Sequence, residues 1–121
     1  NVLGGYGARG RSDAEAEKIV ADAKALEHAG AFAIVVEGVV EPIAIQVTQA
    51  VDVPIIGIGA SAQCDGQVLV VDDMLGMFER VPRFVKKYGD LASQITGHVE
   101  DYAQDVRTRA FPTEDQTYQP K

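Results

Sequence analysis

AFAIVVEGVVEPIAIQVTQAVDVPIIGIG, residues 31–59, is the stretch that decides the fold. Residues 32–36 form a continuous apolar run rich in β-branched side chains, which is typical of a strand covered on both faces. Glu41 and Pro42 predict the start of a short helix, and residues 55–58 predict a second strand. A strand, a helix and a strand in about thirty residues form a βαβ crossover, so we expect the two strands to be parallel neighbours.

One carboxylate, Glu37, directly follows the first predicted strand. In parallel α/β folds, the carboxyl ends of the strands form the face on which active sites are built. We therefore expect Glu37 on that face, partly shielded from water by the apolar strand, as a candidate for chemistry. Two structural roles stay open for it, namely a cap on the helix that begins near Pro42 or an ion pair with a basic residue.

A glycine-rich segment with Arg9 and Arg11 precedes the first predicted helix. It is either a solvated connector or a contact for an anion. Ser12 and Glu15 then have the spacing of a capping box, in which each side chain satisfies an orphaned backbone N–H, and Gly30 suits the end of that helix.

Residues 57–61, GIGAS, form a turn of small residues after the second predicted strand. Such a turn lets a ligand approach the backbone closely, so Gly57, Gly59 and Ala60 are candidates to line a pocket, and phosphate is one possible ligand. The phosphate interpretation is weak by itself, because neither a lysine nor a helix start follows directly.

Residues 68–71 predict a third parallel strand, with Asp72 and Asp73 at its end. Adjacent strand residues point to opposite faces, so we expect these aspartates to act as caps or supporting contacts and not to chelate one metal ion. A short helix is predicted over residues 82–87. Asp90 can cap a last helix whose apolar stripe should bury one side, and the stripe comprises Leu91, Ile95, Val99, Tyr102 and Val106.

Composition and charge exclude several classes of protein. The net charge of −7, with scattered basic residues, argues against a nucleic-acid surface, and no apolar run approaches the roughly 18 residues of a membrane span. The single cysteine, Cys64, excludes an internal disulfide, is expected to be inert and fits a reducing cytoplasm. His28 and His98 are expected to be surface or packing residues. We expect residues 1–110 to form one folded part and residues 111–121 a tail.

Two features predict that the chain is a fragment. It begins with NVLGGY, which resembles a loop entered midway, and three parallel strands are too few to cover both faces of such apolar runs.

Three motifs, GIGA at 57–60, DGQVLV at 65–70 and DMLG at 73–76, together resemble the ketopantoate hydroxymethyltransferase family. GGY at 4–6, GR at 10–11, ALEHAG at 25–30 and AFP at 110–112 extend the resemblance over essentially the whole chain. One departure is Ser61, where the family often has a second glycine.

The resemblance implies an α/β fold, the C-terminal half of a (β/α)8 TIM barrel with strands six to eight and their helices. It implies transfer of a hydroxymethyl group from 5,10-methylenetetrahydrofolate to 3-methyl-2-oxobutanoate, giving ketopantoate for pantothenate synthesis with Mg²⁺ as the metal. The family's general base is a glutamate after the sixth strand, which corresponds to Glu37. Its Mg²⁺ ligands and most substrate contacts are expected in the N-terminal half, so no metal ligand is assigned in this chain.

The expected partners are the keto acid, the folate, the N-terminal half of the barrel and further copies in a homo-oligomer, a decamer by resemblance, in the cytoplasm. Two alternatives stay open: a barrel fragment that binds a phosphorylated molecule through its glycine turns, and a purely structural fragment.

Overall fold

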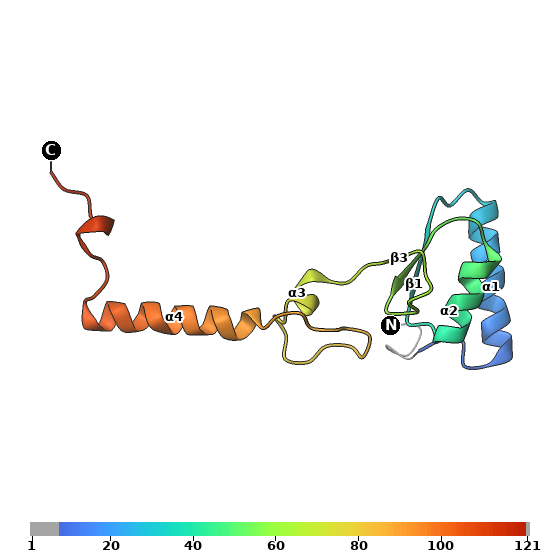
Figure 1. The fold of residues 1–121 in the computed structure, drawn as a ribbon, viewed down its shortest axis with the longest axis horizontal. Helices are drawn as coiled ribbons and strands as arrows, with labels where there is room; N and C mark the ends of the chain where they lie inside the picture. Colours follow the sequence, from blue (N-terminus) through green and yellow to red (C-terminus); the bar gives the residue numbers. More distant parts are fainter. Residues whose placement is uncertain (1–7, 121) are drawn as a thin grey trace. The chain divides into compact units, whose positions relative to one another are not determined.

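The computed structural model describes residues 8–120, which divide into two compact units. The first unit comprises residues 8–70 together with 82–85, and the second comprises residues 71–81 together with 86–120. Figure 1 labels α1 to α4, β1 and β3.

The first unit is built from two helices and a small parallel sheet. Its elements are α1 (Asp13–His28), β1 (Ile34–Glu37), α2 (Glu41–Ala50), β2 (Ile55–Ile58) and β3 (Gly66–Gln67). The sheet order is β1-β2-β3 and both pairings are parallel. This confirms an α/β fold and the predicted crossover, since β1 and β2 are adjacent and α2 connects them.

The core lies where α1 and α2, which pack together, meet the sheet (Figure 1). Ile34 and Val36 of β1 are buried against the helices, whereas Val35 between them is 59% exposed. Phe32 lies before the strand and is also exposed. The expectation of a strand over 32–36 with two covered faces was therefore wrong for this chain: the strand begins at Ile34, and the helices of the unit cover one face of it.

The third strand lies earlier in the chain than predicted. β3 is Gly66–Gln67, and Val71 begins α3 (Val71–Met74) instead of ending a strand. After the Val68 N–H donates to the Gly57 carbonyl oxygen at 3.0 Å, the chain leaves the sheet, so the apolar residues 68–71 continue outside it. Apolar residues extend a sheet only where their backbone pairs with a neighbouring strand, and residues 68–71 do not pair in this way. Asp72 and Asp73 consequently lie in a helical turn, not at a strand end.

The second unit contains α3, α4 (Leu91–Thr108) and the 3₁₀ helix η1 (Glu114–Gln116). Asp90 is the N-cap residue of α4, but its side chain makes no capping hydrogen bond. Near the end of the helix, the rings of Tyr102 and Phe111 meet edge to face, with centroids 5.5 Å apart.

Two expectations about the later part of the chain were wrong. No helix forms over residues 82–87: residues 82–85 form a turn closed by a hydrogen bond from the Val85 N–H to the Pro82 carbonyl oxygen at 3.0 Å. The apolar stripe of α4 is exposed along most of its length, with Val99 at 59%. Its helical spacing was predicted well, but the second unit supplies no layer that covers it. Among the described residues, no helix is both long and apolar enough to cross a membrane.

Candidate functional site

The carboxyl ends of β1 and β2 meet at a pocket of about 1130 Å³ in the first unit. Glu37 is paired in register with Ile58, and both line the pocket. A left-handed glycine follows each strand directly, Gly38 with φ +65° and Gly59 with φ +62°. These glycines turn the chain away at the strand ends, which leaves the Glu37 side chain at the rim of the sheet.

Glu37 is solvent-exposed, so the predicted partial shielding by the apolar strand is not found in this chain. In the part of the chain that the structure describes, its carboxylate has neither a hydrogen bond nor an ion pair. It does not cap α2 either, because Val40 is the N-cap residue of that helix. The two structural roles considered for Glu37 are thus not observed, and an accessible carboxylate remains that can accept a proton.

Of the three small residues expected to line a pocket, Gly59 and Ala60 do so and Gly57 does not. Gly57 instead lies against the side chain of Gln67, since a Cβ on Gly57 would come within 2.8 Å of the Gln67 amide nitrogen. That side chain clamps the turn: its Oε1 accepts from the Gly59 N–H at 3.2 Å, and its Nε2 donates to the Ser61 carbonyl oxygen at 2.7 Å.

The clamp and a close packing contact account for the glycine at position 59. A Cβ there would lie 2.5 Å from the Cβ of Phe84, and the Gly59 N–H is already engaged by Gln67. A phosphate cradle needs backbone N–H groups that are free to point at the ligand. The glycine at position 59 is therefore explained by packing within the unit, and its N–H is not available to a phosphate ligand.

Ser61, the departure from the family pattern, is 5% exposed and joins two elements. Its hydroxyl donates to Glu41 Oε1 at 3.3 Å and accepts from the Gln63 N–H at 3.1 Å. Since Glu41 is in the first turn of α2, this hydroxyl connects the turn after β2 to the helix that follows β1. A glycine could not form that link.

Of the glycine-rich segment 1–11, residues 1–7 lie outside the described residues, and residues 8–11 are not the solvated connector considered above. The Arg9 N–H donates to the Gly38 carbonyl oxygen at 2.6 Å, and the Val40 N–H donates to the Arg9 carbonyl oxygen at 2.9 Å, which makes a parallel bridge between Arg9 and Val39. The segment is thereby fixed immediately beyond Glu37. Both Arg9 and Arg11 line the pocket.

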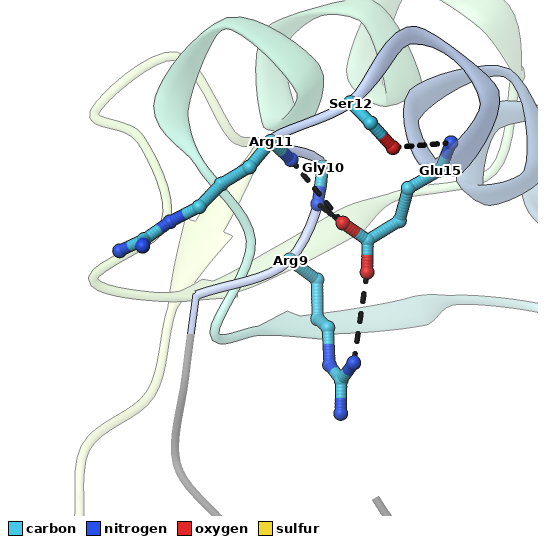
Figure 2. Close-up of polar contacts among 5 residues, drawn as sticks. All are labelled: Arg9, Gly10, Arg11, Ser12 and Glu15. Atoms are coloured by element: carbon cyan, nitrogen blue, oxygen red, sulfur yellow. Dashed lines mark hydrogen bonds and ion pairs between the residues drawn. The ribbon is translucent and has the colours of Figure 1, made fainter. Parts of the chain in front are cut away.

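Glu15 holds the same segment from the side of α1 (Figure 2). Its Oε2 accepts from the N–H groups of Gly10 at 2.9 Å and Arg11 at 3.2 Å, and its Oε1 is 3.6 Å from a guanidinium nitrogen of Arg9. Ser12 accepts from the Glu15 N–H at 3.3 Å, so half of the predicted capping box forms. The other half is replaced, because the Glu15 carboxylate reaches past Ser12 to the two residues before it.

The remaining candidate residues, His28, His98 and Cys64, do not line the pocket. His28 and His98 are exposed, and Cys64 is a free, partly buried thiol whose sulfur lies 3.9 Å from the Thr48 hydroxyl. Within residues 8–120, no group of three or more His, Cys, Asp or Glu side chains could hold a metal ion. The described residues therefore do not fit a magnesium site by themselves.

The family model and the curated relatives that match this chain point to the same family. The family model described as ketopantoate hydroxymethyltransferase matches residues 1–114. Relatives named 3-methyl-2-oxobutanoate hydroxymethyltransferase are 72% identical in Erythrobacter litoralis, 74% in Novosphingobium aromaticivorans and 67% in Sphingopyxis alaskensis. The matches cover 100%, 100% and 98% of this chain but 42%, 42% and 41% of those relatives. With nearly its whole length inside the family model, the chain belongs to the ketopantoate hydroxymethyltransferase family.

Proposed function

We propose that the protein to which this chain corresponds transfers a hydroxymethyl group from 5,10-methylenetetrahydrofolate to 3-methyl-2-oxobutanoate, and that Glu37 is its general base. Family membership supports the reaction. The observation that carries the assignment of Glu37 is its exposed carboxylate at the carboxyl end of β1, on the wall of the pocket, which has no hydrogen-bond or ion-pair partner among the described residues.

The chemistry requires a base at this kind of position. In the proposed step the C3–H bond of the keto acid breaks, the proton goes to a Glu37 oxygen, and the electron pair becomes an enolate. C3 of the enolate then forms the new bond to the one-carbon unit. In the overall reaction, water supplies the hydroxyl oxygen and tetrahydrofolate is released. A positioned carboxylate contributes to proton abstraction when it lies within hydrogen-bond reach of the proton, and the exposed Glu37 carboxylate on the pocket wall is accessible to a bound substrate.

Three parts of the proposal concern residues beyond this chain. We propose a (β/α)8 barrel in which the parallel sheet of the first unit is one segment, a Mg²⁺ site built from ligands elsewhere in the complete protein, and a homo-oligomer. The chain spans about 42% of the length of the relatives it matches, which leaves room for the other strands and ligands. The described residues do not form a site for the metal by themselves.

The test is the Glu37→Gln variant of the complete protein. The amide has nearly the shape of the carboxylate but cannot accept the proton, so we expect kcat to fall by about 10²- to 10⁴-fold, while the KM for the keto acid changes little. Exchange of the substrate's C3 proton with deuterated water, measured by NMR without folate, isolates the proton-transfer step.

Glu41→Gln is the matched control, because Glu41 also lines the pocket but is engaged by Ser61. It should retain C3 proton exchange within a few-fold of the parent. Exchange by Glu37→Gln at the parent rate would show that Glu37 is not the base.

A further inference from the structure

We propose that Arg11 binds a carboxylate group of a substrate in this pocket, and that Glu15 is the positioning residue that holds Arg11 there. The inference rests on the proposed function, since both proposed substrates carry carboxylates: the keto acid has one and the glutamyl end of the folate has two. It deepens that function by naming the pocket residue that recognises the anionic part of the ligand.

The backbone of the segment that carries Arg11 is held from two sides. Arg9 is bridged to Val39, beyond β1, and Glu15 accepts from the N–H groups of Gly10 and Arg11. Gly10 is buried, with φ +83°, and an added Cβ would lie 3.0 Å from Ile43 Cγ1. A backbone fixed in this way presents its side chains from defined positions, which lowers the entropic cost of binding a ligand.

The two arginines of the segment differ in what they contact. Arg9 forms the ion pair with Glu15, whereas the Arg11 side chain extends away from that carboxylate, as Figure 2 shows. Throughout the described residues, the Arg11 guanidinium has no hydrogen-bond or ion-pair partner, although it lines the pocket and is exposed. Glu15 is thus occupied by Arg9 and two amides, and Arg11 remains available to a ligand.

The chemistry of the Arg11 side chain suits a carboxylate. A guanidinium carries parallel N–H donors that match the two oxygens of a carboxylate, and such bidentate pairs are among the strongest charge-assisted hydrogen bonds. The general base proposed for the same pocket, Glu37, is itself an anion and would repel the carboxylate of a substrate. A cation on a different segment of the pocket wall offsets that repulsion and keeps the substrate's carboxylate apart from the base.

The experiment uses the complete protein and four variants, Arg11→Gln and Arg11→Lys in the pocket wall, and Glu15→Ala and Glu15→Gln at the residue that holds it. Lys18→Gln is the control. Like Arg11→Gln it removes one positive charge, but from α1, where Lys18 pairs with Asp22 outside the pocket. Circular dichroism checks that each variant is folded. Steady-state rates are measured while each substrate is varied in turn, and isothermal titration calorimetry measures the binding of each substrate alone.

We expect Arg11→Gln to raise the KM of one substrate about 10- to 100-fold, the range for a hydrogen-bonded charge pair, with kcat within about threefold of the parent. The KM of Arg11→Lys should lie between those of Arg11→Gln and the parent, because lysine keeps the positive charge but lacks the parallel N–H donors of the guanidinium. Glu15→Ala should raise the same KM to a smaller extent. Glu15→Gln should have a KM close to that of the parent, because its amide oxygen can still accept from the N–H groups of Gly10 and Arg11. Lys18→Gln should leave both KM values within twofold.

The two sources of the carboxylate give different results. A higher KM for the keto acid in Arg11→Gln identifies the carboxylate of the keto acid. A higher KM for the folate identifies the glutamyl end, provided that the increase disappears when the folate is replaced by an analogue lacking the glutamyl group. Unchanged KM values for both substrates in Arg11→Gln would overturn the inference, as would a fall in kcat alone. If the parent binds these substrates without turning them over, the proposed reaction fails but calorimetry still decides the role of Arg11.

Discussion

Gly59 and Gly38 have nearly the same left-handed backbone, with φ of +62° and +65°, but different surroundings. A Cβ at position 38 would meet nothing within 4 Å, whereas one at position 59 would lie 2.5 Å from Phe84 Cβ. The two positions therefore separate the cost of the backbone conformation from the cost of overpacking.

We predict that Gly38→Ala lowers the free energy of unfolding by about 1–2 kcal/mol, the cost of a left-handed residue with a side chain. Gly59→Ala should add a further ~1–3 kcal/mol for the displaced Phe84 backbone and side chain. Urea denaturation of both variants and the parent measures the difference. Equal losses would mean that the Gly59 and Phe84 segments separate at no cost.

Prediction from sequence succeeded at the residue scale where position in a strand was sufficient. Glu37 follows a β-branched run, so its place at the carboxyl end of β1 could be predicted from periodicity. The contacts of Glu15 and Gln67 could not, because each side chain reaches a backbone group whose position depends on the folded unit. The spacing of Ser12 and Glu15 did identify the right carboxylate, but it indicated the wrong partner.

At the scale of elements, β2 is anchored at its start by a side chain. Asp65 Oδ2 accepts from the Ile55 N–H at 2.8 Å, and Ile55 is 0% exposed, so water cannot readily replace this acceptor. Asp65 precedes β3 directly, which means that the bond also fixes how the two strands meet.

We predict that Asp65→Ala destabilises the first unit by about 1–3 kcal/mol, the cost of leaving a buried N–H without a partner. Asp65→Asn keeps an oxygen at the same place and should recover at least half of that loss. Thermal unfolding followed by circular dichroism measures both variants. An alanine variant as stable as the parent would show that the Ile55 N–H finds another acceptor.

Elements with strong local signals were predicted well, and those set by tertiary contacts were not. α1, α2 and β2 have caps, periodicity or β-branched runs that agree with their final environment. Residues 68–71 have the composition of a strand, yet only Gly66 and Gln67 pair with β2. Residues 82–87 begin with a proline suited to a helix, yet Phe84 packs at Gly59 within a turn. Local preference is weaker than such contacts.

For the molecule as a whole, we predict that the 121-residue chain alone neither binds Mg²⁺ appreciably nor forms ketopantoate. The physical reason is that, over the described range, no three metal-ligating side chains come together. Calorimetric titration with Mg²⁺ and an assay for ketopantoate test this, with the complete protein as the positive control. Turnover by the isolated chain would contradict the proposal that metal ligands lie elsewhere in the complete protein.

The bridge between Arg9 and Val39 makes motion of the pocket wall measurable by amide hydrogen exchange. Val40 is the N-cap residue of α2, so its N–H has no partner inside the helix, and among the described residues only the Arg9 carbonyl oxygen protects it. The amide protons of Val40 and Arg9 therefore lose protection together whenever this segment detaches, while that of Val47, buried within α2, stays protected. Two backbone protons thus report, without any substrate, the fraction of time for which the pocket wall that carries Arg11 is in place.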